Sequence, residues 1–346
     1  MAAHLNTMDL VRALRQTLVK SRAEYEDSLR KIPQGGGPIF IVGDGPAYLT
    51  AQTAALSFEN LAGRPCLVRS FSEFGAYDLP LLHPHMPVLG ISLSRDTESA
   101  IEAFRAAKRQ GAWLMVLTND PRHPLTTFAD EVFLLHLDGE VQNTAHTLVC
   151  AHAMAGGLGL YAGLIFKPQQ LQRERLLSQL QDLPEHLDQV FSHSSNAIRQ
   201  MIEEVRRLHR ILILGCGFSR PAAVQAAVWM EAALGHWTHG GSPAEFPASI
   251  PDGCDEGTGI IFLSGSRSPH KKLIHDLAGQ VERKKCAILA VTDGGDPELI
   301  RRARLSLLIP AVHEMAGAVL QLAIMQWIDS LAGREPHRVT ETLSRT

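Results

Sequence analysis

The sequence predicts an α/β fold with two tandem domains, each a parallel sheet sandwiched between helices. Three observations support this prediction: short apolar runs alternate with helix-length segments, a Gly-x-Gly turn follows an apolar run in each half, and the two halves repeat one another. Such alternation is typical of parallel sheets covered by helices. At about 100–200 residues per domain, 346 residues can form two complete cores.

In the first half, apolar runs predict the strands and amphipathic spacing predicts the helices between them. The chain starts with a charged amphipathic segment, residues 8–31, which we expect to be helical. The expected strands are residues 39–42, 65–70, 88–92, 113–118 and 131–135. The expected helices between them are residues 52–61 and 97–109, and an apolar segment, residues 144–166, closes the unit.

The second half repeats this order at a nearly constant distance. Gly43-Asp44-Gly45 and Gly215-Cys216-Gly217 each follow an apolar run, at an offset of 215 − 43 = 172 residues. Ser92-Leu93-Ser94-Arg95 and Ser264-Gly265-Ser266-Arg267 keep that offset. Thr118-Asn119 and Thr292-Asp293 stand at an offset of 174, which an insertion of two residues explains. The closing apolar segment recurs as residues 316–328.

The repeat divides the chain into four parts. We expect an N-terminal helix in residues 1–30, a first domain in residues 31–170, a linker and helix in residues 171–200, and a second domain with a C-terminal tail in residues 201–346. The stretch rich in Gln and Arg, residues 168–183, is poor in β-branched residues and is expected to be exposed.

Composition excludes several classes of protein. The 33 Lys and Arg balance 36 Asp and Glu without a long basic run, which argues against a nucleic-acid partner. Five scattered cysteines without a Cys-x-x-Cys pair predict a reducing cytoplasm, and no secretion signal is evident at the start. Residues 144–166 have the length of a membrane span, but their counterpart, residues 316–328, is too short, so we expect no membrane contact.

A cluster of hydroxyls at a strand end indicates a phosphate site. Ser92, Ser94 and Thr97 lie within six residues after the third expected strand, and Arg95 adds a positive charge. Hydroxyls and the amides of a helix start together bind phosphate oxygens. The alternative is that these side chains only cap the helix that begins near Asp96. The second copy has Pro269 in place of the third hydroxyl, so the first copy is the better site.

Other cofactor and metal sites are not supported. Neither Gly-x-Gly turn has the third glycine of a dinucleotide fingerprint, and the histidine pairs around His83 and His236 lack a third ligand at metal spacing. Cys216 is more typical of a small buried residue in a tight turn than of a nucleophile. We therefore expect no metal and no organic cofactor.

The motifs, in this order and twice, resemble tandem SIS (sugar isomerase) domains, as in the isomerase half of glutamine–fructose-6-phosphate aminotransferase and in fructosamine-phosphate deglycases. The family's Ser-x-Ser-Gly-x-Thr phosphate loop resembles Ser92-Leu93-Ser94-Arg95-Asp96-Thr97, with Arg95 replacing the glycine. Its Gly-Thr-Ser turn resembles Gly45-Pro46-Ala47, where Ala47 lacks the hydroxyl, and its Val-Ala-x-Thr helix start resembles Thr144-Ala145-His146-Thr147.

The resemblance also implies where acid–base chemistry takes place. Trp229-Met230-Glu231, after Ser219-Arg220-Pro221, is similar to the family helix whose glutamate moves a proton between sugar carbons, so Glu231 takes that role and Ser219 joins the substrate-binding residues. Ala244-Glu245-Phe246 resembles the family's Gly-Glu-Phe/Leu segment, which makes Glu245 a second catalytic candidate.

Two departures concern ring opening and the C-terminal tail. Where the family continues into His-Gly-Pro, this chain has Pro247-Ala248-Ser249, so the ring-opening histidine has no evident holder, although His236 and His239 lie upstream. Arg338 replaces the lysine of the family's Lys-Val-Thr-Glu terminus and can act only through charge or hydrogen bonds.

These observations predict an enzyme without a cofactor that acts on a phosphorylated sugar or amino sugar, by isomerisation or deglycation. A carboxylate would move a proton between neighbouring carbons, as general acid–base catalysis requires. The main alternative is a phosphosugar sensor that has lost the ring-opening histidine, and a more remote one is a nucleotide-dependent oxidoreductase. The resemblance further implies a homodimer.

Overall fold

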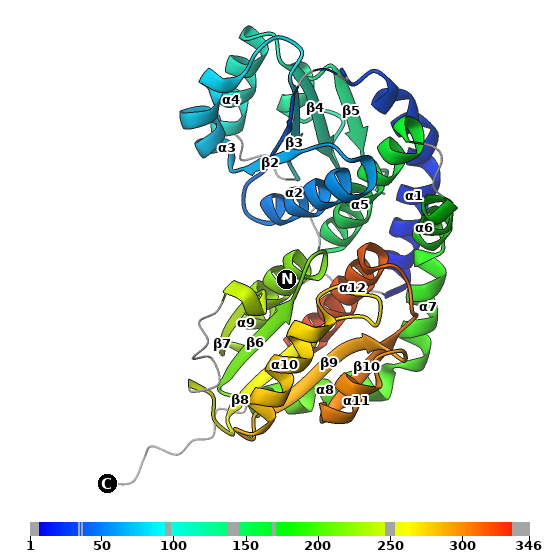
Figure 1. The fold of residues 1–346 in the computed structure, drawn as a ribbon, viewed down its shortest axis with the longest axis vertical. Helices are drawn as coiled ribbons and strands as arrows, with labels where there is room; N and C mark the ends of the chain where they lie inside the picture. The colour runs from blue at the N-terminus through cyan, green and yellow to red at the C-terminus, as the bar shows by residue number, and fades with distance from the viewer. Residues whose placement is uncertain are drawn as a thin grey trace.

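The computed structural model describes residues 7–33, 35, 37–93, 98–137, 145–167, 171–245 and 253–333. It contains two five-stranded parallel sheets, one in each half of the chain (Figure 1). The predicted fold class, two tandem α/β domains, is therefore confirmed. Its physical basis is that strands buried on both faces require helices on both sides.

The first sheet has the order β2-β1-β3-β4-β5. Its strands are β1 (Ile39–Val42), β2 (Cys66–Arg69), β3 (Pro87–Ile91), β4 (Trp113–Thr118) and β5 (Glu131–Leu134). The accompanying helices are α1 (Thr7–Arg30), α2 (Pro46–Ser57) with its π-helical extension η1 (Phe58–Ala62), α3 (Phe71–Glu73), η2 (Phe74–Asp78), η3 (Leu79–Leu81), α4 (Glu98–Arg109), η4 (Pro124–Thr127) and α5 (Ala145–Phe166).

The second sheet has the corresponding order, β10-β9-β8-β6-β7. Its strands are β6 (Arg210–Gly215), β7 (Trp237–Gly241), β8 (Thr258–Leu263), β9 (Ala287–Asp293) and β10 (Leu305–Ile309). Its helices are α9 (Ser219–Leu234), η5 (Pro243–Glu245), α10 (Lys271–Glu282), α11 (Pro297–Arg302) and α12 (Glu314–Ala332).

Three helices connect the domains: α6 (Leu171–Gln181), α7 (Leu183–His193) and α8 (Ser195–Arg206). They cover much of the stretch expected to be an exposed linker. In α6, Leu176 and Leu180 are buried in the main core, because they lie on one face of a helix at a spacing of four residues. Helices α1, α6 and α7 line one side of the molecule from one domain to the other (Figure 1).

The two long apolar helices form the centre of the core. Both α5 and α12 are long and apolar enough to cross a membrane, but most of each is buried inside the molecule. Glycines on α5 let α2 come close: a Cβ on Gly159 would lie 2.4 Å from the carbonyl carbon of Ser57. The close approach of the two helices leaves no room for side chains at these positions, which explains why this segment is rich in small residues.

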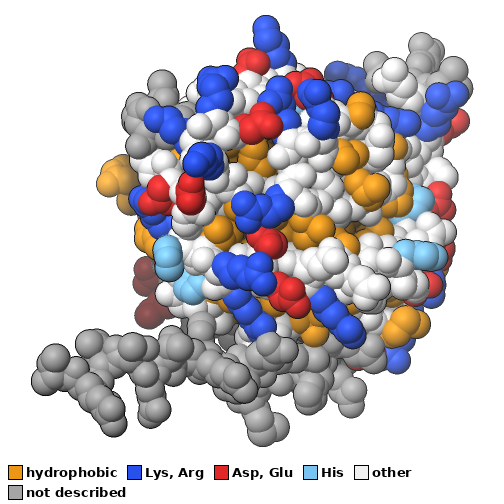
Figure 2. All heavy atoms as spheres, turned by 90° about the horizontal axis from the view of Figure 1, so that it is seen from below, with side chains coloured by type: hydrophobic (Ala, Val, Ile, Leu, Met, Phe, Trp, Pro, Cys, Tyr) orange, Lys and Arg blue, Asp and Glu red, His pale blue; other side chains and the backbone are white. Residues whose placement is uncertain are grey.

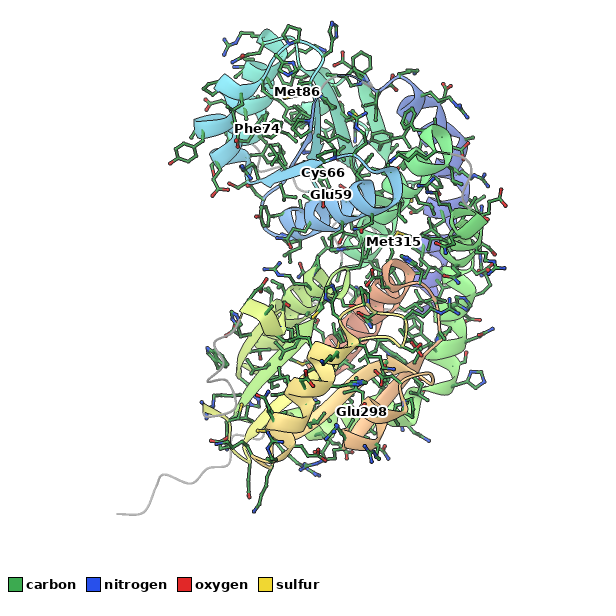
Figure 3. The ribbon with its side chains drawn as sticks, in the orientation of Figure 1. Glu59, Cys66, Phe74, Met86, Glu298 and Met315 are labelled. Atoms are coloured by element: carbon green, nitrogen blue, oxygen red, sulfur yellow. The ribbon has the colours of Figure 1, made fainter. Side chains whose placement is uncertain are left out.

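Met315 connects the domains. It lies in the first turn of α12 in the second domain, and a Cβ on Gly156 of α5 would lie 2.8 Å from its sulfur. Figure 3 shows Met315 at the junction. Ser57 of α2 donates to the Gly156 carbonyl oxygen at 2.5 Å, so α2, α5 and α12 meet at one point and their packing determines how the sheets face each other.

The surface carries charges of both signs. On the face shown in Figure 2, Lys and Arg side chains are interspersed with Asp and Glu. This face therefore has no uniform basic field of the kind that attracts a phosphate backbone.

Candidate functional site

The turn after β1 is shaped by two glycines. Gly45 has φ 55°, and a Cβ on Gly43 would lie 2.7 Å from the Ala47 carbonyl oxygen. Asp44 accepts a hydrogen bond from the backbone N–H of Phe71 at 3.0 Å, which connects this turn to the start of α3, the helix after β2. Ala47 is buried in the first turn of α2. The turn thus brings the backbone of Gly45 to the carboxyl edge of the first sheet, where ligands of open parallel sheets bind.

Ser92 follows β3 at the same edge and contacts a histidine that the sequence analysis did not select. Its hydroxyl oxygen lies 3.0 Å from Nε2 of His123, and both residues are buried. Nδ1 of His123 accepts from the backbone N–H of Leu125 at 3.2 Å. Because a backbone N–H can only donate, Nδ1 carries no proton and Nε2–H donates to Ser92. Only the fold shows this contact, since 31 positions separate the two residues.

Several predicted site residues lie outside the described residues. These are Ser94, Arg95 and Thr97 of the phosphate loop, Thr144 before α5, and Arg338 in the tail. Leu93 is partly buried against the main core, and Ala145 begins α5. The described edge of the first sheet therefore consists of the Gly45 turn, Ser92 with His123, and the start of α5.

Ser219 is bonded within the second domain. Its hydroxyl donates to Oε1 of Gln321 on α12 at 2.7 Å, and the amide of Gln321 donates to the Ser264 carbonyl oxygen at 2.9 Å. All three residues are buried. Gln321 therefore holds the start of α9 against the end of β8, which is a packing role.

Arg220 connects both domains. It donates to Glu245 in its own domain and, at 2.8 Å, to Oε1 of Gln52 on α2 in the first domain. Partial burial raises the pKa of Glu245, but the hydrogen bonds from Arg220 and the backbone of Ser242 outweigh this effect and lower it below its ordinary value. Glu245 is consequently ionised and oriented at neutral pH.

Glu231 occupies the other end of α9. It is exposed in the last turns of the helix, whereas Arg220 lies in the first turn. Eleven residues of helix correspond to about 16 Å, so the chain does not bring Glu231 close to Glu245. His239, one of the two upstream histidines, stacks on Trp237 in the edge strand β7, with ring centroids 6.0 Å apart.

Glu314 is a carboxylate that the motif analysis did not select as a base. It begins α12, and its Oε2 is buried without a hydrogen-bond partner in the described part of the chain. Burial raises its pKa. That oxygen lies 3.4 Å from the Cβ position of Gly217, so it faces the turn after β6. Its place at the start of an apolar helix was visible in the sequence. Its burial was not, because the residues that cover it come from other parts of the chain.

A cavity of about 380 Å³ lies between the domains. The first domain supplies Gln52, Glu59, Cys66 and several apolar side chains, and the second supplies Gly217, Arg220 and Pro221. Glu59 accepts from the backbone N–H of Cys66 at 3.2 Å, and Figure 3 shows these two residues side by side. Among the described residues, no group of three or more His, Cys, Asp or Glu side chains is arranged to hold a metal ion.

Comparison with known proteins identifies relatives. The family model of the SIS domain matches residues 36–156 and 204–328. The chain is 23% identical, over 279 residues, to glutamine--fructose-6-phosphate aminotransferase [isomerizing] of Synechocystis sp., covering 78% of this chain and 44% of that protein. The chain thus spans about half the length of the curated relatives it matches.

Solved structures share the fold. The C-terminal domain of glucosamine-fructose-6-phosphate aminotransferase from Francisella tularensis superposes with a TM-score of 0.82 at 18% identity, covering 95% of this chain and 96% of that one. Tagatose-6-phosphate ketose/aldose isomerase from Escherichia coli superposes with a TM-score of 0.74 at 15% identity, covering 96% and 95%.

Proposed function

Because the chain belongs to the SIS domain family, we propose that it binds a phosphorylated sugar or amino sugar and moves a proton between neighbouring carbons of it. The reaction is aldose–ketose isomerisation, or deglycation of a sugar–amine adduct. The sugar phosphate sits at the carboxyl edge of the first sheet. Ser92, Ser94 and Thr97, with the backbone near Gly45, hold its phosphate.

The observation that carries this proposal is the position of Ser92. It stands at the end of the central strand β3, beside the Gly45 turn, and its oxygen is held by a histidine whose protonation is defined by a backbone donor. A hydroxyl whose oxygen already accepts one bond directs its own proton elsewhere. Such an oriented hydroxyl suits a dianion and positions the substrate for proton transfer.

The proton is moved by a carboxylate, and three candidates differ in their surroundings. Glu231 is exposed, and Glu245 is paired with Arg220. Glu314 is half-buried, and burial raises its pKa toward the range in which a carboxylate is an effective base at neutral pH. Since Glu231 lies near the C-terminal end of α9 and Glu245 is bonded to Arg220 at its N-terminal end, only one of them serves a given sugar within one chain. A homodimer would allow an exposed glutamate to act in the partner's site.

Solvent exchange at the carbon beside the carbonyl tests the proposal. We expect the protein to incorporate deuterium from D₂O into fructose 6-phosphate or glucosamine 6-phosphate and to leave the unphosphorylated sugars unchanged. Of Glu231→Gln, Glu245→Gln and Glu314→Gln, the variant that abolishes exchange while binding persists identifies the base. A wild type that neither binds nor exchanges any phosphosugar in a broad panel would refute the function.

A phosphosugar sensor is the second candidate. It is favoured by Pro247, Ala248 and Ser249, which stand where the family has the histidine that opens the ring, and by the pairing of Glu245 with Arg220. A sensor would bind the phosphosugar without any exchange in the wild type. Ser94→Ala should weaken binding in either case, by about 1–3 kcal/mol for a lost charge-assisted hydrogen bond.

A further inference from the structure

The cavity between the domains has a mostly apolar lining. Both domains contribute to it: Ala55, Leu56 and Val68 come from the first and Pro221 from the second. Its volume of about 380 Å³ lies in the range of pockets that hold small ligands. The cavity also touches Gly217, in the turn after β6, at the edge of the second sheet where ligands of open parallel sheets bind. It is therefore a candidate site in its own right.

Arg220 and Gln52 offer hydrogen-bond donors at one end of this cavity. Nε of Arg220 donates to Glu245, and Nη1 donates to Oε1 of Gln52 at 2.8 Å. These bonds fix both side chains in place. Nη2 of Arg220 and Nε2 of Gln52 donate to no residue that the structure describes. A guanidinium and an amide N–H side by side suit a carboxylate, whose oxygens only accept.

Glu59 places a negative charge at the other end. It follows Gln52 by seven residues in the continuous helix of α2 and η1, so the two lie on one face, about 10 Å apart along the axis. One oxygen of Glu59 accepts from the backbone N–H of Cys66 at 3.2 Å. Glu59 forms no ion pair within the described ranges, and Arg64 donates to two backbone carbonyls instead. This carboxylate can therefore take an ammonium group.

We propose that the cavity binds a linear dipolar molecule, with a carboxylate and a primary ammonium separated by an apolar chain of roughly four to six carbons, as a span of about 10 Å requires. Its carboxylate accepts from Arg220 and Gln52, its ammonium donates to Glu59, and its chain packs on Leu56. This site goes beyond the proposed function. Glu59 lies 14 residues after Gly45, about 20 Å along the helix from the turn that we place beside the phosphosugar.

Calorimetric titration of the full chain with 6-aminohexanoate, at constant ionic strength, tests this inference. Hexanoate and hexylamine each lack one charged end and should bind at least about tenfold more weakly, the effect of losing one charged hydrogen bond. Glu59→Gln keeps an oxygen that accepts from Cys66 and removes only the charge. It should weaken 6-aminohexanoate about tenfold and leave hexanoate unchanged. Glu203→Gln, at an exposed position of α8, is the matched control and should bind as the wild type does.

The opposite end has its own variant. Gln52→Ala should weaken 6-aminohexanoate and hexanoate alike and leave hexylamine unchanged, which keeps the test decisive if Glu59→Gln does not fold. A wild type that does not bind 6-aminohexanoate, or binds it no better than hexanoate and hexylamine, would overturn the inference. So would binding that neither variant weakens, because the probe would then lie elsewhere. No phosphosugar is present in these titrations, so their failure leaves the proposed function standing, and a failed exchange experiment leaves this site standing.

Discussion

Nε2–H of His123 donates to the hydroxyl oxygen of Ser92 across 3.0 Å, in a buried contact between the ends of two neighbouring strands. The other ring nitrogen accepts from the backbone of Leu125 at 3.2 Å. One imidazole therefore caps the turn after β4 and orients the serine that we place in the phosphate site.

Replacing His123 separates these two roles. His123→Asn keeps an acceptor near the position of Nδ1 but does not reach Ser92, whereas His123→Gln keeps a donor near the position of Nε2. We expect His123→Asn to lower the affinity for fructose 6-phosphate about tenfold, the effect of losing one hydrogen bond of about 1.4 kcal/mol, and His123→Gln to retain most of it. Equal affinities in calorimetric titrations of the two folded variants would show that His123 does not orient Ser92.

The bond between Arg220 and Gln52 predicts a coupling between the domains. In a double-mutant cycle of Arg220→Ala and Gln52→Ala, urea unfolding should give a coupling free energy of about 0.5–1.5 kcal/mol, the usual range for one hydrogen bond. Arg210→Ala is the matched control, because Arg210 pairs with Asp255 at the amino-terminal end of β6, whereas Arg220 follows its carboxyl end. Its effect should add to that of Gln52→Ala without coupling.

Arg220→Ala should also change the titration of Glu245. The burial that raises the pKa of Glu245 would remain, while the hydrogen bond from Arg220 that lowers it would be lost. The pKa of Glu245 should therefore rise, and NMR titration of its side-chain carboxyl carbon can follow it. A pKa that stays the same or falls would show that Arg220 does not control the ionisation of Glu245.

The close approach of α2 and α5 predicts a contrast between two glycine substitutions. A Cβ on Gly159 would meet the backbone and hydroxyl of Ser57 at 2.4 Å, so Gly159→Ala should destabilise the protein by about 1–3 kcal/mol through overpacking. Gly317 on α12 has its nearest neighbour at 3.8 Å. Gly317→Ala should therefore be neutral or stabilising by up to about 1 kcal/mol, since alanine favours helix. Thermal unfolding of both variants checks the contrast.

The buried His152 predicts a loss of stability in mild acid. Burial lowers its pKa from 6.5 to about 4 in the folded protein, so the unfolded chain binds the proton more tightly. The free energy of unfolding is therefore unaffected above pH 6.5 and falls as the pH drops toward 4, by about 3 kcal/mol in total. His152→Asn should remove this part of the pH dependence. His209→Gln, at an exposed position, should not. Parallel slopes for wild type and His152→Asn between pH 6.5 and 4 would contradict the prediction.

Much of the fold follows from local patterns. The strands β1 and β4 begin and end where their apolar runs predict. The recurrence of the Gly-x-Gly turn after β6 predicted a second sheet of the same kind. Helix α6 differs from the expected exposed linker, because the burial of Leu176 and Leu180 depends on helices far away in the chain.

The candidate site likewise contains residues that the sequence indicated and contacts that only the structure shows. Its hydroxyls and glycines stand in short motifs that can be found along the chain, and so Ser92 and Gly45 were selected from sequence. The histidine that orients Ser92, the pairing of Glu245 with Arg220, and the burial of Glu314 were not. Each of these depends on groups that are distant in sequence and that meet only after folding.

The sequence by itself determined the strands of the first sheet, the helices α1, α4 and α5 and the order of the two halves, because periodicity and turn chemistry act over a few residues. Only the tertiary structure decided which polar groups face each other. Asp293 shows the difference: the repeat locates it at the end of an apolar run, but packing alone reveals that its carboxylate accepts from the backbone N–H groups of Ser266 and Gly295. Such bonds depend on distances between separate strands, and no local pattern encodes those distances.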